Sequence, residues 1–129
     1  MLRYLLLIAL LCLTACTSDK DDINALLDQR DKSISHKDIS AYTSLLSDGY
    51  LQEHGQLAVQ SIQQVFSRFD EVEMHSRDRR VQINDENHAI CEQTYVLKVL
   101  ADGEWRNIVQ REQLKFHREN DVWKINGGL

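Results

Sequence analysis

The sequence predicts an α+β domain in which N-terminal helices pack on one face of a curved antiparallel sheet. Apolar residues recur at helical spacing as far as Asp70, and beyond it they alternate with a period of two. The dipeptide Asp102-Gly103 separates two β-rich runs, which is a strong signal for a tight hairpin turn. Helices followed by a meander of strands favour an arrangement with all the helices on one side of the sheet.

Three helices are predicted ahead of the sheet. The first begins at Asp22, with Asp21 or Asp22 as its N-cap, and the second is capped by Asp38. A short extended piece at residues 50–54 follows the second helix and ends at Gly55, where the third helix begins. The apolar faces of the three helices are formed, in order, by Ile23, Leu26, Leu27 and Ile34, by Ile39, Tyr42, Leu45 and Leu46, and by Val59, Ile62, Phe66 and Phe69.

Four strands are predicted at residues 72–83, 88–100, 105–117 and 122–126. Turns at residues 84–87, at Asp102-Gly103 and at Glu119-Asn120 would join them into a meander, and these turns set the register. The predicted pairs are Gln93 with Glu112, Tyr95 with Gln110, Asp78 with Gln93, Ser76 with Tyr95, Trp123 with Phe116 and Ile125 with Leu114.

The first residues of the chain are typical of a secretory signal. Arg3 precedes an apolar run that ends in small residues and is shorter than the roughly 20 residues of a membrane span. Leu13-Thr14-Ala15-Cys16 resembles the lipobox of bacterial lipoproteins, in which the cysteine is lipidated and becomes the first residue of the mature chain. The resemblance implies a signal peptide at 1–15, the lipidated Cys16 with a polar tether at 16–22, and a folded domain at 23–129.

The lipobox resemblance also implies a place in the bacterial cell envelope, with the lipid on Cys16 as the membrane anchor. Residues 17–22 span only about 20 Å when extended, so the domain would work close to the bilayer. Thr17-Ser18 lacks the aspartate that accompanies inner-membrane retention in that family. This favours the periplasmic side of the outer membrane.

Composition excludes some classes of function. The chain has 20 acidic and 15 basic residues and a net charge of −5, which disfavours nucleic-acid binding. Cys91 is the only cysteine in the expected domain, so no disulfide is expected there, and its apolar neighbours favour a packed thiol over a nucleophile. The five histidines form no ligand pair at metal spacing, and neither a metal nor a cofactor is expected.

The order of elements resembles the nuclear transport factor 2-like superfamily, the cone-shaped fold shared with ketosteroid isomerase and polyketide cyclases (SnoaL-like proteins). The residues that carry the resemblance are Asp38-Ile39-Ser40-Ala41-Tyr42, Leu45-Leu46-Ser47-Asp48-Gly49-Tyr50, His54-Gly55 and Val122-Trp123-Lys124-Ile125. It implies a ligand cavity between the helices and the concave face of the sheet.

A row of polar residues crosses the sheet face that the helices should cover. Buried carboxylates are costly unless they are paired, hydrogen-bonded or hydrated, so the row indicates a water-lined pocket. A strand end exposed to water, or a hydrogen-bond network that only sets the register, would also explain it. The residues predicted to bind a ligand are Tyr42, Tyr50, His54, Asp78, Gln93, Tyr95, Gln110 and Glu112.

Two functions remain open for this pocket. One is binding of a small apolar or amphipathic ligand, or of a partner protein, without catalysis. The other is an isomerase, dehydratase or cyclase in which Asp78 or Glu112 acts as general base and Tyr95 donates to an oxyanion. Ketosteroid isomerase has its oxyanion tyrosine on the first helix, where this chain has Asp28, Arg30 and Asp31. This difference favours binding over catalysis.

The opposite face of the sheet is predicted to be too apolar for a fully hydrated surface. Superfamily members often dimerise through this face, so a homodimer or an envelope partner is expected on it, with cover by the chain termini as the alternative. Arg79 would oppose Glu92 there in a surface ion pair. The apolar residues of this face are Val81, Ile90, Val96, Leu100, Trp105 and Val109.

Overall fold

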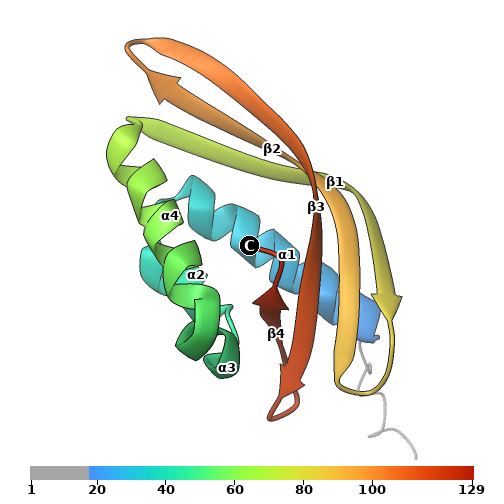
Figure 1. Ribbon diagram of the computed structural model, residues 1–129. Coiled ribbons are helices and arrows are strands. Elements are labelled where there is room, and N and C mark those ends of the chain that lie inside the picture. The colour runs from blue at the N-terminus through green and yellow to red at the C-terminus, as the bar shows by residue number, and fades with distance from the viewer. Residues whose placement is uncertain (1–17) are drawn as a thin grey trace, which may run out of the picture.

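The computed structural model describes residues 18–129, which form a layer of helices against one sheet (Figure 1). The helices are α1 (Asp19–Ser35), α2 (Ile39–Ser44), α3 (Asp48–Tyr50), η1 (Leu51–Gly55) and α4 (Gln56–Arg68). The strands β1 (Glu71–Ile83), β2 (His88–Ala101), β3 (Glu104–Glu119) and β4 (Val122–Gly127) pair in chain order as an antiparallel meander. Figure 1 shows the sheet curving over α1 and α4, so the predicted α+β class is confirmed.

Side-chain caps decide where the first two helices begin. Ser18 Oγ accepts a hydrogen bond from the backbone N–H of Asp21, so α1 begins at Asp19 and not at Asp22. Residues 19–22, expected as part of the tether, are therefore helical. Asp38 caps α2 as predicted, by accepting from the N–H of Ala41 at 3.0 Å.

The extended piece predicted at residues 50–54 is wrong, because this segment is helical. Ser47 Oγ accepts from the N–H of Tyr50 at 3.1 Å and starts a helix at Asp48, which continues through the π-helical turn η1 into α4. Gly55 lies where the last turn of η1 leaves no room for a side chain. A Cβ there would lie 3.1 Å from both Leu51 Cδ2 and the Tyr50 carbonyl oxygen.

The predicted register of the β2–β3 hairpin is confirmed. Ala101 pairs with Glu104, and the pairing continues through Tyr95 with Gln110 to Gln93 with Glu112. The turn residues Asp102 and Gly103 have φ of 53° and 75°, as a type I′ turn requires.

A β-bulge in β1 overturns the predicted position of Asp78. Ser76 pairs with Tyr95 as predicted, but the register shifts between Arg77 and Arg80. Asp78 has a left-handed φ of 54°, and its side chain is 71% exposed, on the solvent side. Because the bulge adds one residue, Arg79 takes the inward position that was predicted for Asp78.

The bulge also inverts the alternation beyond it. Val81 pairs with Cys91 and packs against the core, so its predicted place on the outer face is wrong. Cys91 itself is fully buried, and burial raises the pKa of its thiol, in agreement with the predicted packed thiol.

The β3–β4 turn lies one residue later than predicted, at Asn120-Asp121. These residues have φ of 50° and 63°, a conformation that Asn and Asp tolerate better than Glu. As a result Trp123 pairs with Arg118 and Ile125 pairs with Phe116. The shift by two residues keeps Trp123 and Ile125 on the inner face, where both are buried.

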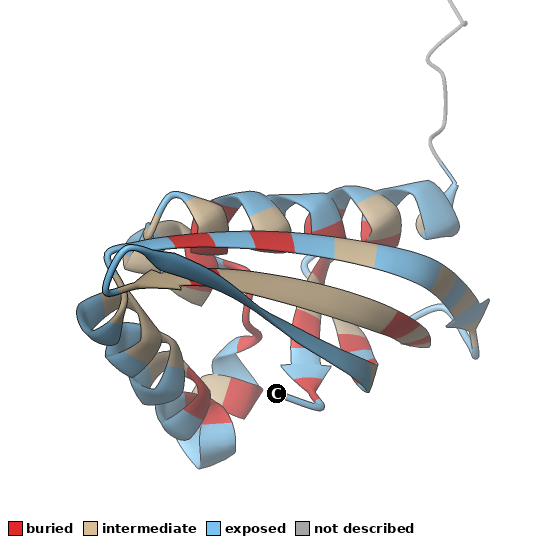
Figure 2. Ribbon diagram, turned by 90° about the horizontal axis from the view of Figure 1, so that it is seen from above, coloured by how far each residue is buried: buried red, intermediate tan, exposed pale blue. Residues whose placement is uncertain are grey.

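The core lies between the helices, mainly α1 and α2, and the inner face of the sheet, and Figure 2 shows buried segments on both layers. Its most buried large side chains are Ile23, Leu27, Ile34, Tyr42, Leu114, Phe116 and Ile125. The predicted signal peptide and lipobox, with Cys16, lie outside the described residues. Among the helices of residues 18–129, none is long and apolar enough to span a membrane.

Candidate functional site

An open cleft of about 510 Å³ lies between α4 and the inner face of β2 and β3. Helix α4 contributes mainly apolar side chains, and the sheet contributes polar ones. The lining residues are Arg30, Tyr42, Leu57, Ala58, Ser61, Ile62, Tyr95, Gln110, Arg111, Glu112, Gln113, Gly128 and Leu129. The cleft therefore has one apolar wall and one polar wall.

The apolar wall is held in place by Lys37, from the loop between α1 and α2. Lys37 Nζ donates to the backbone carbonyls of Phe66 at 2.9 Å, Phe69 at 2.5 Å and Asp70 at 3.1 Å. These carbonyls lie at the C-terminal end of α4, where a cation is favourable. The contact fixes α4 relative to α1, and with it the width of the cleft.

A buried ion pair forms the floor of the cleft. Arg30 Nη1 donates to Glu112 Oε1 at 2.5 Å and to Oε2 at 3.2 Å, and the two side chains are only 7% and 9% exposed. Arg30 Nε is buried without a partner among the described atoms. Arg30 turns inward because it stands on the buried stripe of α1, between Leu27 and Ile34.

Two tyrosines flank this ion pair. Burial raises the pKa of Tyr42 to about 12, although the adjacent Arg30 guanidinium opposes the shift. Burial, and secondarily the Glu112 carboxylate, raise the pKa of Tyr95, whose hydroxyl donates to Gln110 Oε1 at 2.7 Å. The Arg30 guanidinium lies 6.0 Å from the centre of the Tyr95 ring. Both phenols are thus protonated hydrogen-bond donors at neutral pH.

Arg79 forms a second, partly buried network next to the cleft, between α1 and β1. It donates to Asp28 Oδ1 at 2.8 Å, to Gln93 Oε1 at 3.1 Å and to Asp31 Oδ2 at 3.5 Å. Ser76 Oγ also donates to Asp31, at 2.7 Å. Burial raises the pKa of Asp31, and the Ser76 hydrogen bond and the arginines oppose that shift.

Only half of the predicted ligand-binding residues line the cleft, namely Tyr42, Tyr95, Gln110 and Glu112. Gln93 is fully buried behind it, with Nε2 unpartnered. Tyr50 and His54 line a separate groove of about 500 Å³. Asp78 faces solvent, and the predicted pair of Arg79 with Glu92 is wrong because the bulge places Arg80 opposite Glu92.

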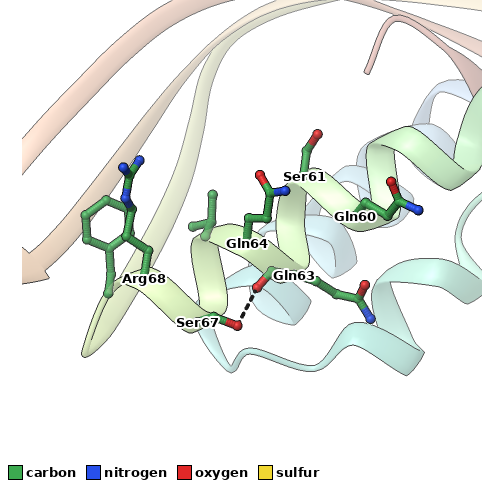
Figure 3. Close-up of a pocket in the computed structure, with 8 residues that line it drawn as sticks. Gln60, Ser61, Gln63, Gln64, Ser67 and Arg68 are labelled. Carbon is green, nitrogen blue, oxygen red and sulfur yellow. Dashed lines mark hydrogen bonds between the residues drawn. The ribbon is translucent and has the colours of Figure 1, made fainter.

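A wider hollow of about 700 Å³ follows α4 and the residues after it. Figure 3 shows the amides and hydroxyls of α4 projecting outward from this one helix, with Ser67 Oγ donating to the Gln63 carbonyl. All its lining residues fall within one continuous segment, residues 60–69, so polar groups do not converge on it from different elements. The cleft above the Arg30–Glu112 pair is the better candidate.

The cleft is built to donate hydrogen bonds. The two carboxylates buried nearest to it, Glu112 and Asp31, are each engaged by an arginine. A general base needs a free lone pair within reach of the substrate, and these contacts direct part of the carboxylate lone pairs toward the arginines instead. Among the residues that the structure describes, no group of three or more His, Cys, Asp or Glu is arranged to hold a metal ion.

Two arginines of the site are absent from the residues predicted to form it. For Arg30 the signal is present, because a charged residue on the apolar stripe of a helix must find a buried partner. For Arg79 there is no comparable signal, since its inward direction depends on the left-handed conformation of one residue, Asp78.

Comparisons with known proteins place the fold. A family model described as a SnoaL-like domain matches residues 23–127. No curated protein matches the chain. A candidate dehydratase of the NTF2-like family from Streptomyces avermitilis superposes with a TM-score of 0.72 at 13% identity, over 85% of this chain and 93% of that one.

Two further solved structures have the same architecture. One is a candidate aromatic ring hydroxylase from Novosphingobium aromaticivorans, with a TM-score of 0.71 at 13% identity over 86% of this chain and 93% of that one. The other is the hexachlorocyclohexane dehydrochlorinase LinA-type3 from Novosphingobium barchaimii, with a TM-score of 0.68 at 12% identity over 83% and 81%. At these identities the similarity concerns the fold alone.

Proposed function

The chain belongs to the family of SnoaL-like domains, and we propose that it binds a small amphipathic ligand in the cleft without transforming it. We further propose that Cys16 carries a lipid that anchors the domain to a membrane of the bacterial cell envelope. The observation that carries the binding proposal is the buried Arg30 at the floor of a cleft whose opposite wall is apolar.

The two walls define the chemistry of the ligand. Leu57, Ala58 and Ile62 offer an apolar surface, and each Å² of apolar area they cover contributes about 25 cal/mol. The phenol of Tyr42 offers a donor beside the guanidinium of Arg30, and the phenol of Tyr95, which donates to Gln110, offers an acceptor. A molecule with a compact apolar body and an oxygen acceptor at one end satisfies both walls.

Within residues 18–129, the positions of the two predicted bases favour binding over catalysis. Of the two predicted bases, Asp78 is on the solvent side of β1 and Glu112 is bound by Arg30. An isomerase, dehydratase or cyclase remains the alternative, and it is favoured by one observation, the Tyr42 phenol held beside Arg30. That alternative requires Glu112 to leave Arg30 when substrate enters.

The proposed location in the cell envelope rests on the sequence motif alone. Leu13-Thr14-Ala15-Cys16 has the residue sizes and position of a lipobox, and Thr17-Ser18 favours outer-membrane sorting. With a lipid on Cys16 and α1 beginning at Asp19, only a few residues separate the domain from the bilayer. The cleft would then take ligands from the membrane surface or from the periplasm next to it.

Native mass spectrometry of the full-length protein, extracted in detergent from its own cells, tests the binding proposal. We expect a retained small molecule in wild type and at least a tenfold loss of it in Leu57→Gln, which removes an apolar wall residue that is exposed in the free protein. Val122→Gln is the matched control, since it changes another exposed apolar residue, 53% exposed against 67% for Leu57, that lies outside the cleft. A wild-type protein that carries no ligand, or equal loss in both variants, would refute binding at this site.

A further inference from the structure

Two histidine rings meet on the surface of the sheet, at the end opposite the Asp102-Gly103 turn. His88 is the first residue of β2, and His117 lies near the end of β3, directly opposite it. The two ring centres are 5.1 Å apart, and the ring planes are tilted by 44°. The side chains are 57% and 35% exposed, so solutes can reach both rings. Neither residue lines the cleft.

The backbone ladder holds the two rings side by side. The N–H of Arg118 donates to the Asn87 carbonyl at 2.9 Å. The His88 carbonyl accepts from Asn84, which follows β1, so His88 turns its backbone groups away from β3. His88 and His117 are therefore a non-hydrogen-bonded pair, the kind in which Cα atoms lie about 4.5 Å apart and side chains come closest. The register of two strands creates this pair, which has no counterpart in spacing along one helix.

A carboxylate lies beside Nδ1 of each ring. His88 Nδ1 is 2.9 Å from Asp85 Oδ1 and 3.1 Å from Oδ2. An ionised carboxylate can only accept, so the neutral ring donates from Nδ1 and keeps a lone pair on Nε2. His117 Nδ1 is 3.8 Å from Glu119 Oε1, which is within ion-pair distance. Within residues 18–129, no hydrogen bond engages Nε2 of either ring.

Backbone N–H groups hold both carboxylates in place. Asp85 Oδ1 accepts from the N–H of Asn87 at 2.8 Å, within the turn between β1 and β2. Glu119 Oε2 accepts from the N–H of Asp48, at the start of α3, at 3.5 Å. Histidines that bind a metal almost always donate their other ring N–H to a carboxylate or a carbonyl, which orients the ring and makes it more basic. The surroundings of the two rings meet this requirement.

We propose that His88 and His117 bind one divalent transition-metal ion, of the Zn²⁺ or Cu²⁺ class, through their Nε2 atoms. Imidazole is a good ligand for both ions, and it binds them in its neutral form. Two nitrogens at about 2.0–2.1 Å from a tetrahedral Zn²⁺ stand about 3.3 Å apart. Ring centres 5.1 Å apart allow this separation when both Nε2 atoms turn toward one point.

The protein supplies two ligands to this ion, and water fills the other positions. The site is thus of a different kind from a centre with three or more His, Cys, Asp or Glu ligands, for which residues 18–129 contain no suitable group. Two imidazoles on an exposed surface hold a metal less tightly than a closed four-ligand site does. The open positions leave the bound ion accessible to a further ligand.

The charges around the rings favour a dication over an anion. Asp85 and Glu119 together bring two negative charges, which balance the charge of the ion and would repel a phosphate or a sulfate. On β4 the residue opposite His117 is Lys124. Its Nζ donates to the Ser44 carbonyl at 2.7 Å, so the ammonium group is directed away from the ring pair.

Titration calorimetry of the full-length chain with Zn²⁺, and separately with Cu²⁺, tests the site. We expect one saturable site in wild type and at least a tenfold loss of affinity in His88→Gln and in His117→Gln. His75→Gln, which removes another exposed strand histidine, is the matched control and should bind as wild type does. Asp85→Asn keeps an acceptor for the Asn87 N–H but loses the charge beside the ring, and should weaken binding by about tenfold.

Nuclear magnetic resonance of the wild-type chain gives a test that needs no substitution. Substoichiometric Cu²⁺ should broaden the ring signals of His88 and His117 before those of the other three histidines. A wild type without saturable binding of either ion, or equal affinity in wild type and both glutamine variants, would overturn the proposal. So would even broadening of all five histidines, the result expected when the two rings only pack against each other. Ligand binding in the cleft is a separate result, because the two sites share no residue.

Discussion

Replacing Glu112 by glutamine removes the charge that neutralises Arg30 and keeps the size of the side chain. The guanidinium would then be buried beside a neutral amide that still offers one acceptor oxygen. Both side chains are less than 10% exposed, so solvent screens the remaining charge only weakly. Removing one partner of a buried ion pair costs about 3–5 kcal/mol, and the retained acceptor and the adjacent cleft reduce this to about 2–3 kcal/mol.

The effect is measured by chemical and thermal unfolding of the full-length protein, followed by circular dichroism. A loss of about 2–3 kcal/mol corresponds to a melting temperature lowered by roughly 8–12 °C for a domain of this size. The double variant Arg30→Met/Glu112→Leu completes the comparison, because it removes both charges and fills the space. We expect it to lie within about 1 kcal/mol of wild type, since buried ion pairs can be replaced by apolar residues without loss.

The reasoning fails if Glu112→Gln unfolds within about 0.5 kcal/mol of wild type. Such tolerance would mean that water reaches both groups and that the floor of the cleft is hydrated, as the polar row in the sequence by itself indicates. An equally large loss in the double variant would show that the pair contributes through packing and not through charge.

Three other perturbations test separate parts of the structure. In the folded chain burial raises the Tyr42 pKa to about 12 from an ordinary 10.0, so the free energy of unfolding should fall by up to roughly 3 kcal/mol as pH rises from 10 to 12. Tyr42→Phe should abolish that fall and remove the last step of a phenolate absorbance titration. A single step near 10 in wild type would contradict this prediction. Asp78 has a left-handed φ, which glycine adopts without strain and valine does not. In urea unfolding, Asp78→Gly should therefore stabilise the domain by up to about 1 kcal/mol, and Asp78→Val should destabilise it by a similar amount or more. Equal stability of the two variants would speak against the bulge. Wild type should carry acyl mass on Cys16 and partition into detergent, whereas Cys16→Ser should do neither; an unmodified soluble wild type in cells with a lipoprotein pathway would rule out the anchor.

Residue patterns determined those parts of the fold that depend on local interactions. The turn at Asp102-Gly103 requires positive φ at two neighbouring residues, and this requirement alone sets the whole β2–β3 register. Helix caps and apolar periodicity likewise act over three or four residues, which is why Asp38 could be assigned as a cap and the faces of α1 and α4 as apolar.

Tertiary structure decided the features in which two local choices have similar energies. Helix and strand compete over Tyr50–His54, and the helical start at Ser47 prevails because its backbone N–H also bonds the Ile125 carbonyl on β4. An extra residue at Asp78 costs little by itself, yet it reverses the direction of every side chain from Arg79 to Ile83. The partners of Arg79 on α1, Asp28 and Asp31, lie about fifty residues away along the chain, and only packing of α1 on β1 brings them together. Which residues form the site depends on those distant contacts. Sequence periodicity could therefore locate the cleft, but it could not show that Arg30 and Arg79 form ion pairs with the buried carboxylates.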